Sequence, residues 1–182
     1  MAHGLTTEGH VAGPVPGALV PFARALAAIN RVVVFLSMIA LVLAAAVLTY
    51  SVFSRYLFKA ATDWQDEIAV FLLVCSTFMC GAYVQSYRGH VGIEAVASIL
   101  PPAVNRWRML VVDVLTFLFC AFFAWKSWAL FHEAWVDNMT TSSSWAPPLT
   151  IPYGFMSAGM TLLSLQALLQ VLTRVVRSEQ RL

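Results

Sequence analysis

Four long apolar runs organise the chain, and each is long enough to cross a lipid bilayer. They cover residues 32–54, 68–87, 109–134 and 151–173. A spanning helix needs about 20 mostly apolar residues, whereas a spanning strand needs only about 10 of alternating polarity. Lipid offers the backbone no hydrogen-bond partner, so runs of this length predict helices. The pattern therefore predicts an all-α integral membrane protein with four transmembrane helices, in a membrane domain of residues 24–177.

A shorter amphipathic stretch separates the second run from the third. Ile93, Val96, Ala97 and Leu100 recur at the spacing of one helical face. Pro101 then interrupts the pattern, because proline cannot continue a helix. This predicts a short interfacial helix between the second and third spans, lying at the membrane surface. The alternative is an irregular loop.

The positive charges predict the orientation of the helices. With four spans both termini share one side, and most lysines and arginines fall on that side. They are Arg24, Arg31, Arg88, Arg106, Arg108, Arg174, Arg177 and Arg181. Cytoplasmic loops carry the excess of positive charge, so both termini are predicted to be cytoplasmic. Residues 1–23, rich in Gly, Pro and Thr, are expected to form a flexible cytoplasmic tail, and residues 178–182 a cytoplasmic C-terminus.

The composition agrees with a bilayer and excludes several functions. The chain is 60% hydrophobic and only 11% charged, where a soluble domain is about a quarter charged. A net charge of +2 without a basic run argues against nucleic-acid binding. Cys75, Cys80 and Cys120 show no metal-binding spacing and are predicted to be packing residues. A haem carrier needs histidines paired on facing helices, and the histidines lie at or beyond the edges of the runs, so no cofactor is expected.

Asp113 is the one acidic residue well inside an apolar run. Acidic residues within a membrane are costly and are candidates for function. Asp113 lies about one turn from the cytoplasmic end, where Arg106, Arg108 or lipid headgroups could reach it. Two interpretations remain open, a structural contact or a proton or ion relay. Lys126, near the other end of the same run, is predicted to extend its ammonium outward to the interface.

Small residues recur at four-residue spacing in the runs. Thr77 and Gly81 form one such step, and Gly154 and Ala158 form another. Such steps let helices approach closely, either within this chain or against a partner.

A charge cluster fills the connection between the first two runs. It contains Arg55, Lys59, Asp63, Asp66 and Glu67. Thr62 or Asp63 is suited to cap the second helix. We expect Arg55 and Glu67 to lie at the same depth and to pair. The cluster either closes a helical hairpin or meets another subunit.

The order and spacing of several motifs resemble a known family. They are Arg55 at the end of the first run, Trp64 with Asp66 and Glu67 opening the second, Gly81 late in it, and Arg88, His90 and Glu94 after it. Together they resemble the DctQ-like small membrane subunit of tripartite ATP-independent periplasmic (TRAP) transporters. Many members of that family have a proline shortly before the tryptophan, where this chain has Ala60, Ala61 and Thr62.

The resemblance implies a multi-pass protein of the bacterial inner membrane that is not an enzyme. Its expected partners are a large DctM-like membrane subunit, a DctP-like periplasmic substrate-binding protein and membrane lipid. The large subunit would hold the substrate and sodium sites, and this chain would brace it during uptake of an organic acid. The motif residues would then be structural or would lie at a subunit interface. The alternatives are a self-contained small carrier using Asp113 and an electron-transfer membrane anchor.

Overall fold

The computed structural model describes residues 19–59, 62–86 and 102–179. They form four helices, α1 (Val20–Phe58), α2 (Asp63–Ser86), α4 (Pro102–Val136) and α5 (Thr150–Glu179). All four are long and apolar enough to cross a membrane. The prediction of an all-α protein with four spanning helices is confirmed. The expected interfacial helix, together with Arg88, His90 and Glu94, lies outside the described residues.

The helices extend beyond the apolar runs that predicted them. α1 has 39 residues and begins twelve residues before the run at 32–54. At 1.5 Å per residue it is about 58 Å long, nearly twice the roughly 30 Å of hydrocarbon in a bilayer. Pro21 is tolerated in the first turn of α1, where its missing N–H has no helical partner. Lys59 ends α1 in a left-handed conformation, with φ of 50°.

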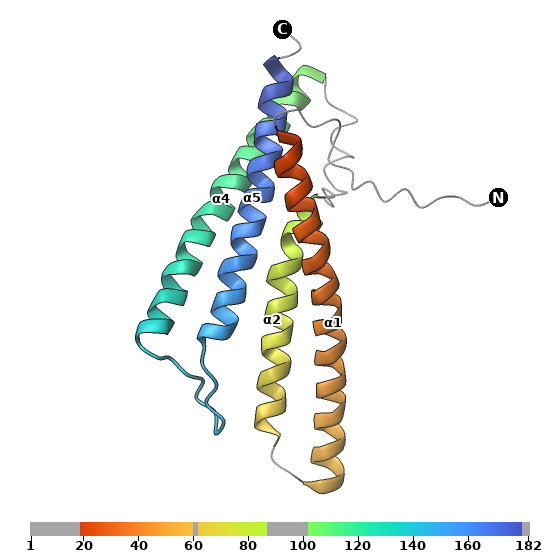
Figure 1. Cartoon of the computed structure of the whole chain (residues 1–182), viewed down its shortest axis with the longest axis vertical. Helices are drawn as coiled ribbons and strands as arrows, with labels where there is room; N and C mark the ends of the chain where they lie inside the picture. Colours follow the sequence, from red (N-terminus) through yellow and green to blue (C-terminus); the bar gives the residue numbers. More distant parts are fainter. Residues whose placement is uncertain (1–18, 60–61, 87–101, 180–182) are drawn as a thin grey trace, which may run out of the picture.

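The four helices lie side by side as an open layer. α1 packs against α2, α2 against α5, and α5 against α4. This order runs across Figure 1 from right to left. α1 and α4 are therefore the edges of the layer, and α5 is the most buried of the four spans.

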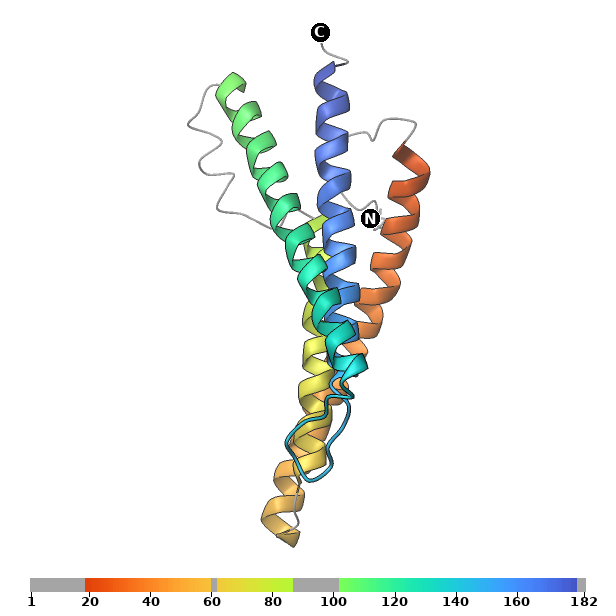
Figure 2. The ribbon, with the colours of Figure 1, turned by 90° about the vertical axis from the view of Figure 1, so that its left-hand side faces the viewer.

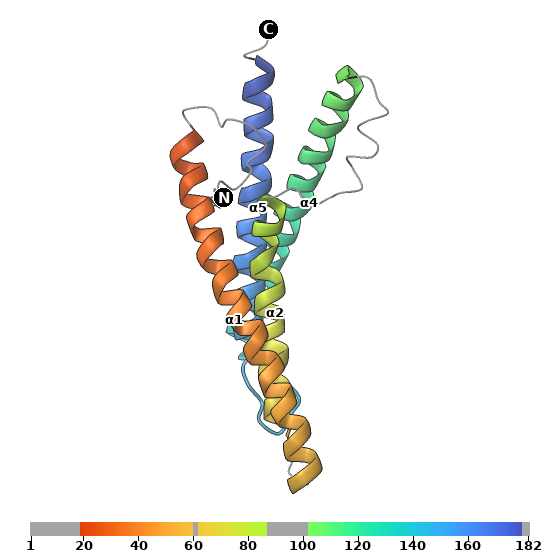
Figure 3. The same cartoon turned by 90° about the vertical axis from the view of Figure 1, so that its right-hand side faces the viewer.

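The layer has two distinct ends. We call the end where α1 stops and residues 137–149 connect α4 to α5 the loop end, and the opposite end the terminal end. Toward the terminal end α1 and α4 spread apart on either side of α5 (Figures 2 and 3). At the loop end the α1–α2 hairpin reaches beyond the ends of α4 and α5 (Figure 1).

Gly159 brings the backbones of α2 and α5 together. A Cβ placed on this buried glycine would lie 2.5 Å from the carbonyl oxygen of Phe78. No residue with a side chain fits there without moving a helix. Gly81, which the sequence singled out, is different, because a Cβ there would meet Leu163 at an ordinary 3.7 Å. The closest approach between these helices therefore depends on a glycine outside the predicted small-residue steps.

Candidate functional site

The first polar centre lies at the loop end, where α1 meets α2. We call Ser51, Arg55, Thr62 and Asp66 the hairpin corner. Arg55 Nη2 lies 2.8 Å from Asp66 Oδ2 and donates to Thr62 Oγ1 at 2.6 Å. Ser51 Oγ donates to the other oxygen of Asp66 at 3.0 Å. The Arg55 and Asp66 side chains remain 62% and 47% exposed, so this ion pair stays open to its surroundings.

Arg55 pairs with Asp66, so the expected pairing with Glu67 is wrong. Successive helical residues point about 100° apart. Asp66 faces α1, whereas Glu67 faces residues 137–149 and accepts a hydrogen bond from Thr141 Oγ1 at 2.6 Å. Thr62 precedes α2, and its carbonyl accepts the N–H groups of Gln65 and Asp66 at 3.0 and 3.3 Å. Thr62 is therefore at the capping position, with its hydroxyl turned to Arg55.

Glu67 connects the two helical hairpins. The connection between α4 and α5 is held in place by its own backbone, since Leu149 N–H donates to Met139 O at 2.9 Å and Thr141 N–H to Pro147 O at 3.1 Å. This arrangement presents Thr141 to Glu67. The other carboxylate oxygen of Glu67 is buried and has no hydrogen-bond partner among the described residues. Trp64, in the first turn of the same helix, is exposed.

The second polar centre follows one face of α5 toward the terminal end. Its three α5 side chains are Gln166, Gln170 and Arg174, each four residues from the last. Asn30 of α1 donates from Nδ2 to Gln166 Oε1 at 3.3 Å. Gln85 of α2 donates from Nε2 to Gln170 Oε1 at 2.9 Å, and Gln170 Nε2 donates back to the Gln85 carbonyl at 2.8 Å.

The third link of this centre is an ion pair with α4. Arg174 Nε lies 2.6 Å from Asp113 Oδ2, and the two side chains are only 22% and 8% exposed. Each of the other three helices thus gives one polar side chain to this face of α5. We call this set the α5 seam, and its members are Asn30, Gln85, Asp113, Gln166, Gln170 and Arg174. Buried polar groups of this kind fix how helices align, because leaving one unpaired is costly.

Sequence reasoning missed most of the α5 seam. It found Asp113 but named Arg174 only as a cytoplasmic charge and not as the partner of Asp113, although Arg174 follows directly after the apolar run at 151–173. Arg108, one of the expected partners, donates to the side chain of Asn105 at 2.9 Å. The sequence does contain a pattern that predicts this polar face. Polar side chains recur every four residues in an otherwise apolar helix, at Gln166, Gln170 and Arg174.

The ammonium of Lys126 lies against aromatic rings of its own helix. Its ammonium lies 4.9 Å from the ring centroid of Trp125 and 6.0 Å from that of Phe122. Both rings belong to residues that precede Lys126 in α4. This follows from helix geometry, because side chains tilt toward the N-terminal end of their helix. On the opposite side of α4, Trp128 Nε1 donates to Thr161 Oγ1 at 3.0 Å.

The polar contacts of the described residues mainly join one helix to another. Among them, no group of three or more His, Cys, Asp or Glu side chains could hold a metal ion. The three cysteines are free thiols in the spans. The strongest polar contacts join helices to one another, at the hairpin corner and along the α5 seam.

Comparison with known sequences places these features in a family. The chain matches the family described as tripartite ATP-independent periplasmic transporters, DctQ component, over residues 44–177. No curated protein sequence matches the chain. The matched region contains the C-terminal part of α1 from Ala44 onward, all of α2 and α4, nearly all of α5 and the described part of the loop end. The family is one of transporter subunits and not of enzymes, and its members work in three-part systems. The chain is therefore a member of the DctQ family, a small membrane subunit of a TRAP transporter.

Proposed function

We propose that this chain braces a large DctM-like membrane subunit while that subunit imports an organic acid with a sodium gradient. A DctP-like binding protein would deliver the substrate at the periplasmic face. The chain would act as an accessory subunit that does not bind the solute. The observation that carries this proposal is the engagement of Asp113 by Arg174 in the interior of the helical layer.

A carrier acid must bind and release a cation or proton during each cycle. Asp113 is 8% exposed and held by a charge-assisted contact of 2.6 Å. Releasing it would leave a charged group unpaired in a poorly hydrated place. This argues against the self-contained carrier that the sequence left open. It favours a role in which Asp113 fastens α4 to α5.

The electron-transfer alternative has little support in the described residues. The histidine among them, His132, is exposed near the loop end of α4. A haem held within a helical membrane protein needs axial ligands directed at a shared central position. An absorbance spectrum of the purified protein tests this alternative, because bound haem would give a Soret band.

Reconstitution tests the proposed function. The chain would be placed in proteoliposomes alone, with its large subunit, and with both the large subunit and the binding protein. Under an inward sodium gradient, uptake of the organic acid is expected only with all three proteins. Uptake by the chain alone would overturn the accessory role. Copurification of the small and large subunits checks their association separately from uptake.

We further propose that the family motif residues act within the chain. Arg55 and Asp66 hold the α1–α2 hairpin together, and Glu67 fastens that hairpin to the α4–α5 connection. Trp64, exposed at this level, suits the boundary between lipid and water. The motif would thus maintain the shape of the loop end.

The proposed orientation puts the loop end in the periplasm and both termini in the cytoplasm of a bacterial inner membrane. Single cysteines at the exposed Ser144 and at the exposed Val104 would be introduced after replacing the native cysteines. A membrane-impermeant thiol reagent added to spheroplasts should label position 144 and spare position 104. Labelling at position 104 with protection at position 144 would reverse the topology.

A further inference from the structure

The two edge helices expose apolar faces of different character. α1 carries no charged residue between Arg31 and Arg55. Its exposed side chains there are mostly aliphatic, among them Val32, Leu36, Leu41, Val42 and Val52. Aliphatic side chains match lipid tails, and three exposed aromatic side chains, Phe35, Tyr50 and Phe53, lie among them in this part of α1. α4 differs in shape, in aromatic content and in charge.

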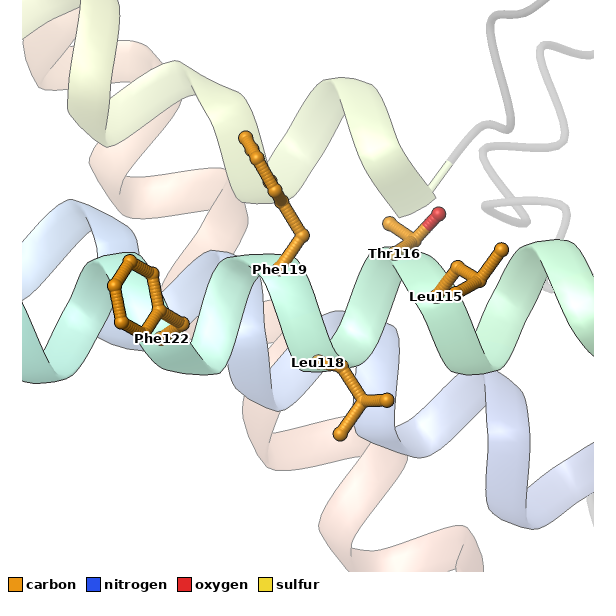
Figure 4. Close-up of a pocket in the computed structure, with 5 residues that line it drawn as sticks. All are labelled: Leu115, Thr116, Leu118, Phe119 and Phe122. Atoms are coloured by element: carbon orange, nitrogen blue, oxygen red, sulfur yellow. The ribbon is translucent and has the colours of Figure 1, made fainter.

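A shallow hollow lies on the exposed side of α4. Its volume is about 680 Å³. Its lining residues all belong to α4 and are Leu115, Thr116, Leu118, Phe119 and Phe122 (Figure 4). They span about two helical turns. The hollow is thus an open, shallow depression along one helix, apolar except for the Thr116 hydroxyl.

Lys126 lies one helical turn after the last residue of this hollow and is the charged residue on the same part of α4. It is exposed, and its ammonium lies against the rings of Trp125 and Phe122. Among the described residues it has these ring contacts and no acidic partner. Ten residues separate Lys126 from Val136 at the end of α4, which is about 15 Å along the helix.

The depth of Lys126 conflicts with a lipid-facing surface. The apolar run of α4 covers residues 109–134, so Lys126 lies eight residues, about 12 Å along the helix, from its nearer end. No other charged residue lies between Asp113 and Lys126. Ionisable side chains at such depth face protein or a hydrated cavity and pair with a counter-charge.

We propose that this face of α4 is the docking surface for a transmembrane helix of the large membrane subunit. The α4 docking face comprises the five hollow residues with Trp125 and Lys126. The partner helix would place an aliphatic ridge in the hollow and a carboxylate of Asp or Glu beside the Lys126 ammonium. The α1 face would lie against lipid. This inference rests on the proposed function, because it supposes that the large subunit is present.

Cross-linking distinguishes the two edges. A photoreactive amino acid would replace Leu118 or Phe122 on α4, and Val42 or Val52 on α1 as controls that are at least as exposed. The variants would be co-expressed with the large subunit and irradiated in native membranes. We expect adducts with the large subunit from the α4 positions and not from the α1 positions. Adducts to lipid alone, or to a second copy of this chain, from both α4 positions would overturn the proposal.

Charge variants test Lys126 itself. Lys126→Met keeps the length and removes the charge, Lys126→Glu reverses it, and Lys126→Arg keeps it. Since loss of one partner of a buried interfacial ion pair weakens a complex strongly, we expect Lys126→Met to lower copurified large subunit about tenfold or more. Lys126→Glu should lower the amount of copurified large subunit at least as much, and Lys126→Arg should retain most of the complex. Equal copurification of all three variants with the parent would overturn the role of Lys126.

The same experiments separate this inference from the proposed function. If the parent chain fails to copurify with the large subunit, the proposed function fails and the inference fails with it. If the complex forms and transports, but cross-links arise from α1, only the docking face is wrong. The melting temperature of each isolated variant provides a folding control. Lys126→Met should match the parent, because Lys126 lies on the exposed side of α4.

Discussion

The hairpin corner and the α5 seam use the same chemistry in opposite surroundings. Each contains an arginine–carboxylate pair, Arg55 with Asp66 and Arg174 with Asp113. The first joins residues eleven apart, and its side chains are about half exposed or more. The second joins residues 61 apart, and its acid is 8% exposed. The same pair of functional groups therefore closes a turn at one end and fixes the position of two helices at the other.

Burial decides the energetic weight of each pair. A solvent-exposed ion pair contributes about 0–1 kcal/mol. Removing one partner from a buried pair costs about 3–5 kcal/mol, because the remaining charge is left without compensation. We therefore expect the α5 seam to dominate the stability of the chain and the hairpin corner to adjust local geometry.

The largest expected effect is at the buried pair. Asp113→Ala or Arg174→Ala should lower the free energy of unfolding by about 3–5 kcal/mol, because each leaves a buried charge. Thermal unfolding in detergent, followed by circular dichroism, measures the change. Asp63→Ala is the matched control, since Asp63 is exposed at the start of α2. The double variant Asp113→Leu/Arg174→Met should recover much of the loss. If Asp113→Ala and Asp63→Ala melt alike, the α5 seam is not the stabilising centre.

The next effect is at the closest helix contact. Gly159→Ala should destabilise the protein by about 1–3 kcal/mol, because its new methyl group would press on the Phe78 backbone. Gly81→Ala is the matched control. Its methyl group would meet Leu163 at ordinary contact distance and should leave the melting temperature unchanged or slightly raised. The opposite ranking of these two glycines would show that α2 and α5 pack differently.

A smaller effect is expected at the neutral part of the α5 seam. Gln170→Leu removes both hydrogen bonds with Gln85. Side-chain hydrogen bonds between membrane helices contribute about 0.6 kcal/mol on average and about 1.7 at most. Thr77→Val is the control, because its exposed hydroxyl bonds only within its own helix at 2.8 Å. If Gln170→Leu and Thr77→Val give the same unfolding curve, the hydrogen bonds between Gln85 and Gln170 do not contribute to stability.

The smallest effect is expected at the hairpin corner. Arg55→Ala should cost the isolated chain about 0–1 kcal/mol at low salt. At 1 M salt the Debye length falls to about 3 Å, so the difference from the parent should shrink. The loss caused by Asp113→Ala should persist at the same salt concentration, because that pair is buried. If salt reduces the destabilisation by Asp113→Ala as much as it reduces that by Arg55→Ala, the two centres do not differ in burial as described.

Sequence reasoning identified the right regions more often than the right partners. It selected Arg55 and Asp113 as charges needing an explanation, and the structure places both in ion pairs. It paired Arg55 with Glu67, although a single residue along α2 turns the side chain from α1 toward Thr141. It did not name Arg174 as the partner of Asp113, because a partner 61 residues away is known only when α4 and α5 are packed.

The number of helices, their lipid surroundings and the family follow from local properties of the chain. The length of an apolar run determines whether it can cross a bilayer, and a motif is read from neighbouring residues. The open layer centred on α5, the contact at Gly159 and the partners of each polar side chain are not local. They depend on how two helices are rotated and shifted against each other, and a rotation of about 100° changes which neighbour a residue meets. Only the packed tertiary structure determines that rotation.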